Sequence, residues 1–434
     1  MERFIMDDLV RWKNRNDRKP LILLGARQVG KTYILKEFGR REYANVAYIN
    51  CDNNALVRDL FTPDYNIERI LLTIGAITGV NILPGKTLII MDEVQELKRG
   101  LASLKYFCED APEYHVAVAG SLLGLTLHDG DSYPVGKVNT LNMYPMTFEE
   151  FLLAHNRKQM VDLLQAQRWD FVKGLRTLYI QHLREYYLVG GMPEAVDKFV
   201  QTNDANLVRE VQNEILAAYE KDISKHAPAE QVMRIGQVWH SIPSQLAKEN
   251  RKFIYGVVKK GARAKDYELA IQWLLDAGLV YKVNRVTTLA MPLKIHEEIS
   301  AFKLFMLDCG LLGAMSLTPP AMLLLPSTDN SGKGDFTENF VCSQMKSLSD
   351  LPVFYYSKDN SQLELDFVVQ ADTAVCPVEV KAEENLQSKS LKTTLSENPD
   401  MHGLRFSMSD YREEGRLTNV PLYGARSFLK ALKQ

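Results

Sequence analysis

The fold of the first part of this chain is indicated most clearly by the stretch Leu21-Ile-Leu-Leu-Gly25-Ala-Arg-Gln-Val-Gly30-Lys31-Thr32. It reads as a short apolar strand, a loop with two glycines, and the start of a helical pattern that continues to Phe38. The loop has the spacing GxxxxGK followed by Ser or Thr, in which glycine lets backbone N–H groups turn inward to face phosphates. The lysine of such a loop reaches the β and γ phosphates, and the hydroxyl binds Mg²⁺. The stretch therefore predicts a loop that binds ATP and Mg²⁺, with contacts from Gly25, Ala26, Arg27, Gln28, Val29, Gly30, Lys31, Thr32 and Tyr33.

A second strand-like run, Leu88–Met91, ends in two carboxylates that such a loop requires. We expect Asp92 to hold the Mg²⁺ hydration shell and Glu93 to orient the attacking water as a general base. A third run ends at Gly120-Ser121, where Ser121 is a candidate sensor of the γ phosphate, although an ordinary turn explains it equally well. These positions predict ATP hydrolysis, with the catalytic residues Glu93, Lys31 and Ser121.

Phosphoryl transfer also requires positive charge near the leaving group, which is commonly supplied by an arginine. Arg27 lies inside the loop, and Lys137 follows a second glycine at Gly136. Both residues are candidates for this role, but a solvated surface group, the usual state of Arg and Lys side chains, is the favoured interpretation of each.

Short apolar runs alternate with helical patterns through the first part of the chain. Continuous apolar runs of this length are typical of strands buried on both faces of a parallel sheet, so the pattern predicts an α/β fold class. From about Pro145 the pattern turns helical, and Thr147 with Glu150 has the spacing of a capping box. The four apolar runs are Leu21–Leu24, Val46–Ile49, Leu88–Met91 and Val116–Ala119.

Composition restricts the class of protein further. The 434 residues carry a net charge of −2, with 46% hydrophobic and 24% charged residues, as in folded globular proteins of two or three domains. No apolar run reaches the length of about 18 residues that a membrane span needs, so we expect no membrane contact. The five cysteines lie far apart without a CxxC pair, which indicates free thiols in a reducing cytoplasm rather than a metal site or disulfides.

The middle of the chain contains a strongly basic segment. Residues 246–265 hold seven basic residues against one acidic residue, Glu249, which gives a local charge of +6. The segment lies within helices followed by the strand-like run Leu279–Arg285, the coarse outline of a winged helix. A solvated charged face explains the segment as well as DNA contact does, and DNA contact would be salt-dependent. The seven residues are Lys248, Arg251, Lys252, Lys259, Lys260, Arg263 and Lys265.

A second cluster of chemically active residues is expected near the C-terminus. Asp366 lies on an apolar strand, and Glu379 and Lys381 point to one face of the next strand because side chains alternate. Two carboxylates beside a lysine are the groups of a Mg²⁺-dependent nuclease, and Glu338 on a preceding helix would complete the set. Three interpretations remain: an active nuclease, a nuclease-like fold that no longer cuts, and an unrelated fold with a buried ion pair.

Together these residues resemble a family of bacterial and archaeal AAA-type P-loop ATPases that carry a C-terminal PD-(D/E)XK nuclease-like domain of unknown function. The resemblance spans nearly the whole chain. Many relatives carry Gly-Arg where this chain has Gly136-Lys137, which puts an arginine finger at that point in doubt. Besides the loop and Asp92-Glu93, the resemblance rests on Gly120-Ser121, Tyr144-Pro145-Met-Thr-Phe-Glu-Glu-Phe151, Gly190-Gly191-Met-Pro193, Phe302-Lys-Leu-Phe-Met-Leu-Asp308-Cys-Gly310, Glu338-Asn-Phe, Leu365-Asp366-Phe and Glu379-Val-Lys381.

The resemblance implies how the chain is divided. We expect an AAA-type ATPase core with a parallel sheet at 1–145 and a helical lid at 146–228. A winged-helix-like domain at 229–316, a linker at 317–335 and a nuclease-like α/β domain at 336–434 would follow. ATPases of this type often form rings, so a homo-oligomer is a candidate assembly.

We therefore expect an ATPase that uses ATP and Mg²⁺ and whose nucleotide cycle controls a DNA-facing module. An ATP-gated DNA nuclease is the first alternative, and it requires metal-dependent cleavage by the C-terminal cluster. A non-catalytic, ATP-dependent regulatory switch or docking protein is the second alternative, and it requires bound ATP without turnover.

Overall fold

The computed structural model describes residues 1–52, 54–120, 133–248, 251–324, 333–359, 363–384 and 386–433. The chain forms two compact units. The nucleotide unit, as we call it, comprises Glu2–Tyr144 together with Asp276–Gly278. The larger unit comprises Pro145–Leu275 and Leu279–Gln434. The predicted end of the ATPase core, at residue 145, lies one residue from this division.

The nucleotide unit is built on a parallel sheet of five strands in the order β2-β3-β4-β1-β5. All four apolar runs expected from the sequence are strands of this sheet, so the α/β prediction is confirmed. The fifth strand was not predicted, because its sequence, Asn-Thr-Leu-Asn, is mostly polar. It lies at an edge of the sheet, where the side chains are only partly buried and need not be apolar. The strands are β1 (Leu21–Leu24), β2 (Asn45–Asn50), β3 (Thr87–Asp92), β4 (His115–Ala119) and β5 (Asn139–Asn142).

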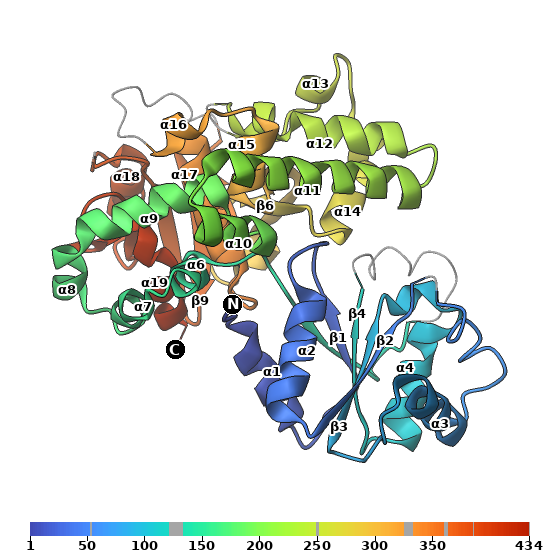
Figure 1. The fold of residues 1–434 in the computed structure, drawn as a ribbon. Helices are drawn as coiled ribbons and strands as arrows, with labels where there is room; N and C mark the ends of the chain where they lie inside the picture. The colour runs from blue at the N-terminus through green and yellow to red at the C-terminus, as the bar shows by residue number, and fades with distance from the viewer. Residues whose placement is uncertain are drawn as a thin grey trace. The chain divides into compact units, whose positions relative to one another are not determined.

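Helices cover both faces of this sheet, as Figure 1 shows, with α1 and α2 on one face and α3 and α4 on the other. Strands β3 and β4 are buried along their whole length, which explains why their sequences are continuous apolar runs. The short helix η1 (Val94–Glu96) follows β3. The helices are α1 (Ile5–Lys13), α2 (Lys31–Glu42), α3 (Ile67–Thr78) and α4 (Gly100–Asp110).

The larger unit begins with a series of helices. The capping box expected at Thr147 is present: its side chain accepts from the Glu150 backbone N–H, and the Glu150 carboxylate accepts from the Thr147 N–H. These helices are α6 (Phe148–Ala154), α7 (Lys158–Gln165), α8 (Trp169–Gly174), α9 (Arg176–Val189), α10 (Pro193–Thr202), α11 (Ala205–His226), α12 (Val232–Leu246), α13 (Tyr255–Val258) and α14 (Ala264–Asp276).

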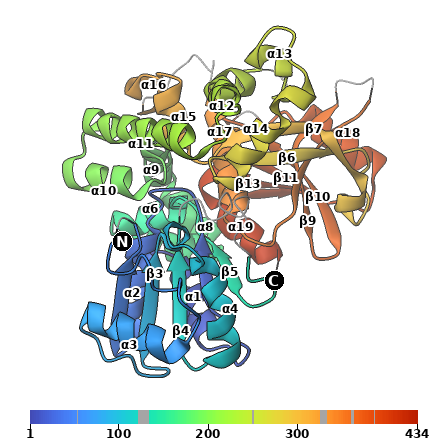
Figure 2. The ribbon, with the colours of Figure 1, turned by 90° about the vertical axis from the view of Figure 1, so that its right-hand side faces the viewer.

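A mixed sheet of eight strands, in the order β12-β13-β11-β10-β9-β8-β6-β7, forms the rest of this unit (Figure 2). Its strands are β6 (Val280–Val286), β7 (Glu297–Met306), β8 (Val353–Ser357), β9 (Glu364–Ala371), β10 (Ala374–Val380), β11 (Gly403–Ser407), β12 (Arg412–Glu414) and β13 (Leu417–Pro421). The remaining helices are η2 (Leu293–His296), α15 (Cys309–Met315), α16 (Pro320–Leu324), α17 (Lys333–Lys346), α18 (Lys389–Glu397), η3 (Leu422–Gly424) and α19 (Ala425–Leu432).

This sheet crosses the boundary that the sequence suggested between a winged-helix-like domain and a nuclease-like domain. Strands β6 and β7 lie in the former range, yet β6 pairs in parallel with β8 of the latter, with Arg285 opposite Tyr355. The predicted linker also contains α16 and the first residues of α17. An alternating pattern identifies a strand but not its partner, so the shared sheet was not readable from the sequence.

Two of the unexplained motifs, Gly190-Gly191 and Asp308-Cys-Gly310, meet in the core of the larger unit. The buried Asp308 carboxylate accepts hydrogen bonds from the backbone N–H of Gly191 and, at 2.9 Å, from that of Leu311 at the start of α15. Gly190 has φ +75°, and a Cβ there would lie 2.2 Å from the Asp308 carboxylate. The two motifs therefore form a structural clamp, which joins α9 to α15.

Two expectations from composition concern the whole chain. In the described ranges, no helix combines the length and apolar character needed to cross a membrane. All five cysteines are free thiols, and four of them are buried, with Cys108 partly exposed.

Candidate functional site

The loop between β1 and α2 has the tight backbone that a phosphate-binding loop requires. Gly25 has φ +149°, and a Cβ there would lie 2.2 Å from the carbonyl oxygen of Met143, so only glycine fits. Gln28 and Gly30 also have positive φ, of 64° and 95°, before α2 begins at Lys31. The loop therefore leads directly into a helix N-terminus, where free N–H groups and the helix dipole favour an anion.

Lys31 lies inside this loop. Its side chain is buried, and its amino group donates to the carbonyl oxygens of Gly25, at 2.8 Å, and Ala26, at 2.7 Å. Burial lowers the pKa of Lys31 to about 8, while the nearby charges of Glu93 and Asp92 oppose this shift. The amino group is thus held by loop carbonyls at the place where phosphate oxygens are expected.

Thr32 and Asp92 lie side by side, although 60 positions separate them in sequence. The Thr32 hydroxyl donates to Asp92 Oδ2 at 2.7 Å, and the Tyr48 hydroxyl donates to the same oxygen at 3.1 Å. A hydroxyl beside a carboxylate at the end of a strand suits Mg²⁺, because both are hard oxygen ligands. Sequence reasoning missed Tyr48, whose place depends on β2 pairing with β3.

Glu93 follows the end of β3. It adopts a left-handed backbone conformation with φ +52°, which is strained for a residue other than glycine, and its carboxylate accepts from the Gln95 side chain. Its backbone N–H donates to Ala119 O at 2.7 Å, which fixes it next to the end of β4. Ser121, the candidate sensor beyond that strand, lies outside the described residues.

The remaining predicted residues of the nucleotide site are Arg27, Tyr33 and Lys137. Arg27 is half-buried within it, and its charge contributes to lowering the pKa of Lys31. Tyr33 is 53% exposed on α2. Lys137 precedes β5 at the edge of the sheet where Leu21 pairs with Asn139, whereas the loop follows the opposite ends of the strands. Lys137 forms an ion pair with Glu109 at 2.8 Å there, so it cannot serve the loop of its own chain.

The C-terminal candidates come together as the alternation of side chains predicts. Lys381 Nζ lies 2.6 Å from Glu379 Oε1, and the Val380 backbone N–H donates to Asp366 Oδ2 at 2.7 Å. Burial and the Asp366 charge raise the pKa of Glu338, and burial likewise raises the pKa of Glu379. We call Glu338, Asp366 and Glu379 the carboxylate cluster.

A divalent metal does not fit this cluster as it stands. Arg251, from the basic segment, places its guanidinium 2.7 Å from Glu338 Oε1. Within the described ranges, no group of three His, Cys, Asp or Glu side chains has the arrangement needed to hold a metal ion. We therefore derive no metal chemistry from these residues.

The rest of the basic segment differs from Arg251. The side chains of four residues around α13 and the start of α14 are exposed, and their charges face solvent. Arg251 is instead paired with Glu338 and with Asp335, which removes it from the predicted DNA-facing set. These four residues are Lys259, Lys260, Arg263 and Lys265; of the other two, Lys248 is exposed and Lys252 is half-buried.

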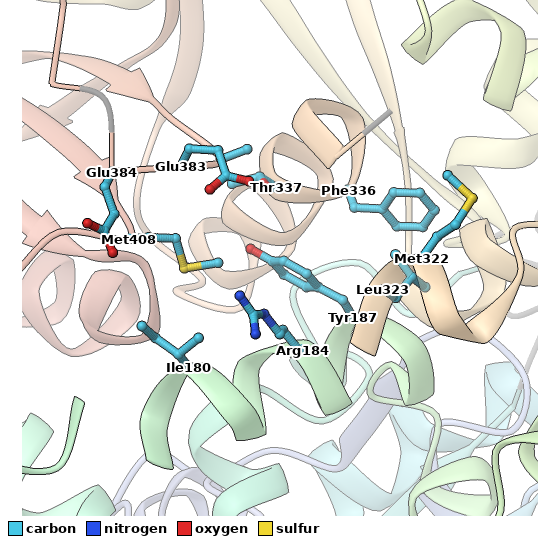
Figure 3. A pocket seen from close by; sticks show the side chains of 11 residues that line it. Ile180, Arg184, Tyr187, Met322, Leu323, Phe336, Thr337, Glu383, Glu384 and Met408 are labelled. Atoms are coloured by element: carbon cyan, nitrogen blue, oxygen red, sulfur yellow. The ribbon is translucent and has the colours of Figure 1, made fainter. Parts of the chain in front are cut away.

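One cavity of the larger unit is lined by sequence neighbours of the carboxylate cluster. Its lining includes Thr337, next to Glu338, and Glu383, two residues after Lys381. Figure 3 shows Arg184 and Tyr187 of α9 entering it from one side, with Phe336 and Thr337 of α17 across from them. Its volume of about 60 Å³ holds a few water molecules but is far below that of a nucleotide site. ATP is therefore not its ligand.

Three family models match separate parts of this chain. Residues 17–152 match an AAA domain, residues 180–321 match a domain of unknown function (DUF8612), and residues 333–423 match another (DUF4143). The AAA match contains the loop, Asp92 and Glu93. Neither of the other two matches carries a functional description, and the DUF4143 match contains the carboxylate cluster.

Individual relatives are distant. The chain is 28% identical over 227 residues to the uncharacterized protein MJ1637 of Methanocaldococcus jannaschii, a match that covers 48% of this chain and 44% of that protein. The chain thus spans less than half the length of that relative.

Similar solved structures include the Walker-type ATPase paby2304 of Pyrococcus abyssi, with TM-score 0.45 and 15% identity over 73% of this chain and 95% of that chain. Orc1 of Aeropyrum pernix, solved in complex with DNA, gives TM-score 0.27 and 13% identity over 74% and 92%. The RuvB Holliday junction branch migration motor of Thermotoga maritima gives 0.29 and 15% over 64% and 86%. The loop thus has the geometry of a phosphate-binding P-loop, and residues 17–152, which contain it, match the model of an AAA domain.

Proposed function

We propose that the nucleotide unit binds ATP with Mg²⁺ and hydrolyses it, and that this cycle controls a DNA-facing module in the larger unit. The observation that carries the proposal is the contact of Thr32 with Asp92 at 2.7 Å, directly beside the buried Lys31. This arrangement collects a cation for the phosphates, two hard oxygen ligands for Mg²⁺ and a neighbouring carboxylate in one place.

Each residue has a separate task in this proposal. Lys31 exchanges the loop carbonyls for β and γ phosphate oxygens and neutralises their charge. Thr32 and Asp92 would hold Mg²⁺, which draws charge from the phosphates as they separate. Glu93 accepts a hydrogen bond from the attacking water and takes its proton. The left-handed backbone at Glu93 and the hydrogen bond from the Gln95 side chain restrict the position of this carboxylate.

ATP turnover by two variants tests this assignment. Replacing Lys31 with Ala should weaken ATP binding at least tenfold, because it removes the buried ammonium group that the loop holds where the phosphates are expected. The substitution Glu93→Gln should leave binding intact and lower kcat by about 100-fold or more, the usual contribution of a general base. Binding by calorimetry and phosphate release in single-turnover conditions separate the two effects.

The exposed Glu96 on η1 offers a matched control, since Glu96→Gln removes the same charge three residues away and should leave kcat unchanged. A normal rate in both the Lys31 and Glu93 variants would refute the assignment. Tight ATP binding without turnover in the unmodified protein would instead support the non-catalytic switch.

The DNA-facing part of the proposal rests on charge. Lys259, Lys260, Arg263 and Lys265 are exposed within a short segment around α13, and such a group attracts a phosphate backbone. The ATP-gated nuclease has less support, although its candidate residues are neighbours, because Arg251 occupies the side of Glu338 that a metal would need.

A further inference from the structure

We infer that Arg251 supplies the positive charge that a divalent cation would otherwise bring to Glu338, Asp366 and Glu379, so that the carboxylate cluster is a closed, metal-free ion-pair centre. The inference concerns the larger unit alone. It does not depend on ATP hydrolysis by the nucleotide unit.

The first support is the geometry of the guanidinium. Its Nη1 lies 2.7 Å from Glu338 Oε1 and its Nη2 lies 3.2 Å from Asp335 Oδ1, so the fork spans two carboxylates one helical turn apart on α17. The Arg251 side chain is only 16% exposed, and that of Glu338 is 5% exposed. Each partner of a pair so far from water depends strongly on the other, and without Arg251 the remaining positive charge that favours ionised Glu338 is that of Lys303.

The second support is that the local backbone is arranged to deliver this side chain. Arg251 has φ +51°, a left-handed conformation that is uncommon for residues other than glycine, asparagine or aspartate. Across from it, Gly334 leaves room for the guanidinium: a Cβ there would lie 3.0 Å from Arg251 Nη2. A solvent-exposed arginine without an ion pair would require neither the left-handed backbone nor the room that Gly334 leaves.

The third support is that the other carboxylates are also occupied. Glu379 pairs with Lys381, and Asp366 accepts from the Val380 backbone N–H at 2.7 Å. One oxygen of each glutamate, Oε2 of Glu338 and Oε2 of Glu379, is buried without a hydrogen-bond donor. These two oxygens are the acceptors that a cation would meet if Arg251 were removed.

Mn²⁺ binding to the 434-residue chain, without added nucleotide, tests the inference. Wild type should show no Mn²⁺ binding that depends on Glu379, whereas Arg251→Ala should gain one Mn²⁺ site that the second substitution Glu379→Gln removes. The Arg251→Ala variant should also melt at a lower temperature than wild type, and saturating Mn²⁺ should raise its Tm by roughly 4 °C or more. Isothermal calorimetry and differential scanning fluorimetry measure the two effects.

Lys260→Ala is the matched control: it removes one charge from the same basic segment at an exposed position, and it should gain no Mn²⁺ site. Glu379-dependent Mn²⁺ binding in the wild type would overturn the inference, because the cluster would then already be an open metal site. A folded Arg251→Ala protein that binds no Mn²⁺ would overturn it as well. If Arg251→Ala does not fold, the comparison of Mn²⁺ binding between wild type and the single variant Glu379→Gln still tests whether the wild-type cluster binds metal.

Discussion

At the scale of single residues, Lys31 shows how burial adapts a side chain to its ligand. Burial lowers its pKa to about 8, so the amino group begins to lose its proton within the pH range of ordinary buffers. Phosphate oxygens favour the ammonium form, so bound nucleotide should raise this pKa. The residue is therefore poised to change its proton occupancy when nucleotide binds.

The affinity for ATP should consequently depend on pH. Below pH 8 the lysine is already charged, and affinity should be nearly constant between pH 7 and 7.5. As pH rises through 8 the free protein loses the proton that the complex keeps, so Kd should increase by up to about tenfold per pH unit. Titrations of Mg-ATP from pH 7 to 9.5 measure the change. In Lys31→Arg, whose charge is permanent, the dependence should disappear; a steep dependence in that variant would assign the effect to another group.

At the scale of elements, the clamp between α9 and α15 explains two motifs that have no part in the nucleotide site. Asp308 is the N-cap of α15 and also holds the turn after α9 through Gly191. Because one buried carboxylate serves two backbone donors, its loss leaves both N–H groups without a partner.

We expect Asp308→Ala to destabilise the larger unit by about 2–4 kcal/mol, from an N-cap and a second buried hydrogen bond. The exposed N-cap of α11 supplies a control, since Asp204→Ala removes a comparable cap at the surface and should cost about 1 kcal/mol. Burial raises the pKa of Asp308 to about 6, above its usual value of 3.8. The stabilisation from this group is thus complete below pH 4 and is lost as pH rises through 6.

The difference between wild type and Asp308→Ala should therefore narrow by about 1 kcal/mol between pH 5 and pH 7.5. Chemical denaturation at the two pH values measures it. A difference that widens with pH would mean that the folded protein favours the charged carboxylate instead.

At the scale of the whole molecule, the proposed nucleotide and DNA contacts lie in different units, so control of one by the other requires coupling between them. Replacing both Lys259 and Lys260 with Ala should weaken DNA binding and reduce the slope of log K against log salt by about two. Fluorescence anisotropy over 50–250 mM salt measures both. Mg-ATP should change the DNA affinity of wild type but not of Lys31→Ala. If neither Mg-ATP nor the loss of Lys259 and Lys260 changes the DNA affinity, the proposal of a DNA-facing module is refuted.

Several parts of this protein depend on local sequence pattern alone and could be predicted from it. The loop from Gly25 to Thr32, the strand ending at Asp92 and the α/β class follow from glycine geometry, spacing and continuous apolar runs. The alternation of side chains likewise predicted that Glu379 and Lys381 share a face. These features depend only on neighbouring residues and on one periodicity, so they can be predicted without knowledge of the tertiary packing.

Which distant residues and strands pair with each other became clear from the folded structure. Tyr48 reaches Asp92 because β2 lies beside β3, and Lys137 is excluded from the loop because it lies at the opposite ends of the strands. The sheet that joins β6 to β8, and the ion pair that takes Arg251 out of the basic segment, connect residues about 70 or more positions apart. Such contacts depend on register and burial rather than on local propensity, which is why no pattern in the sequence contained them.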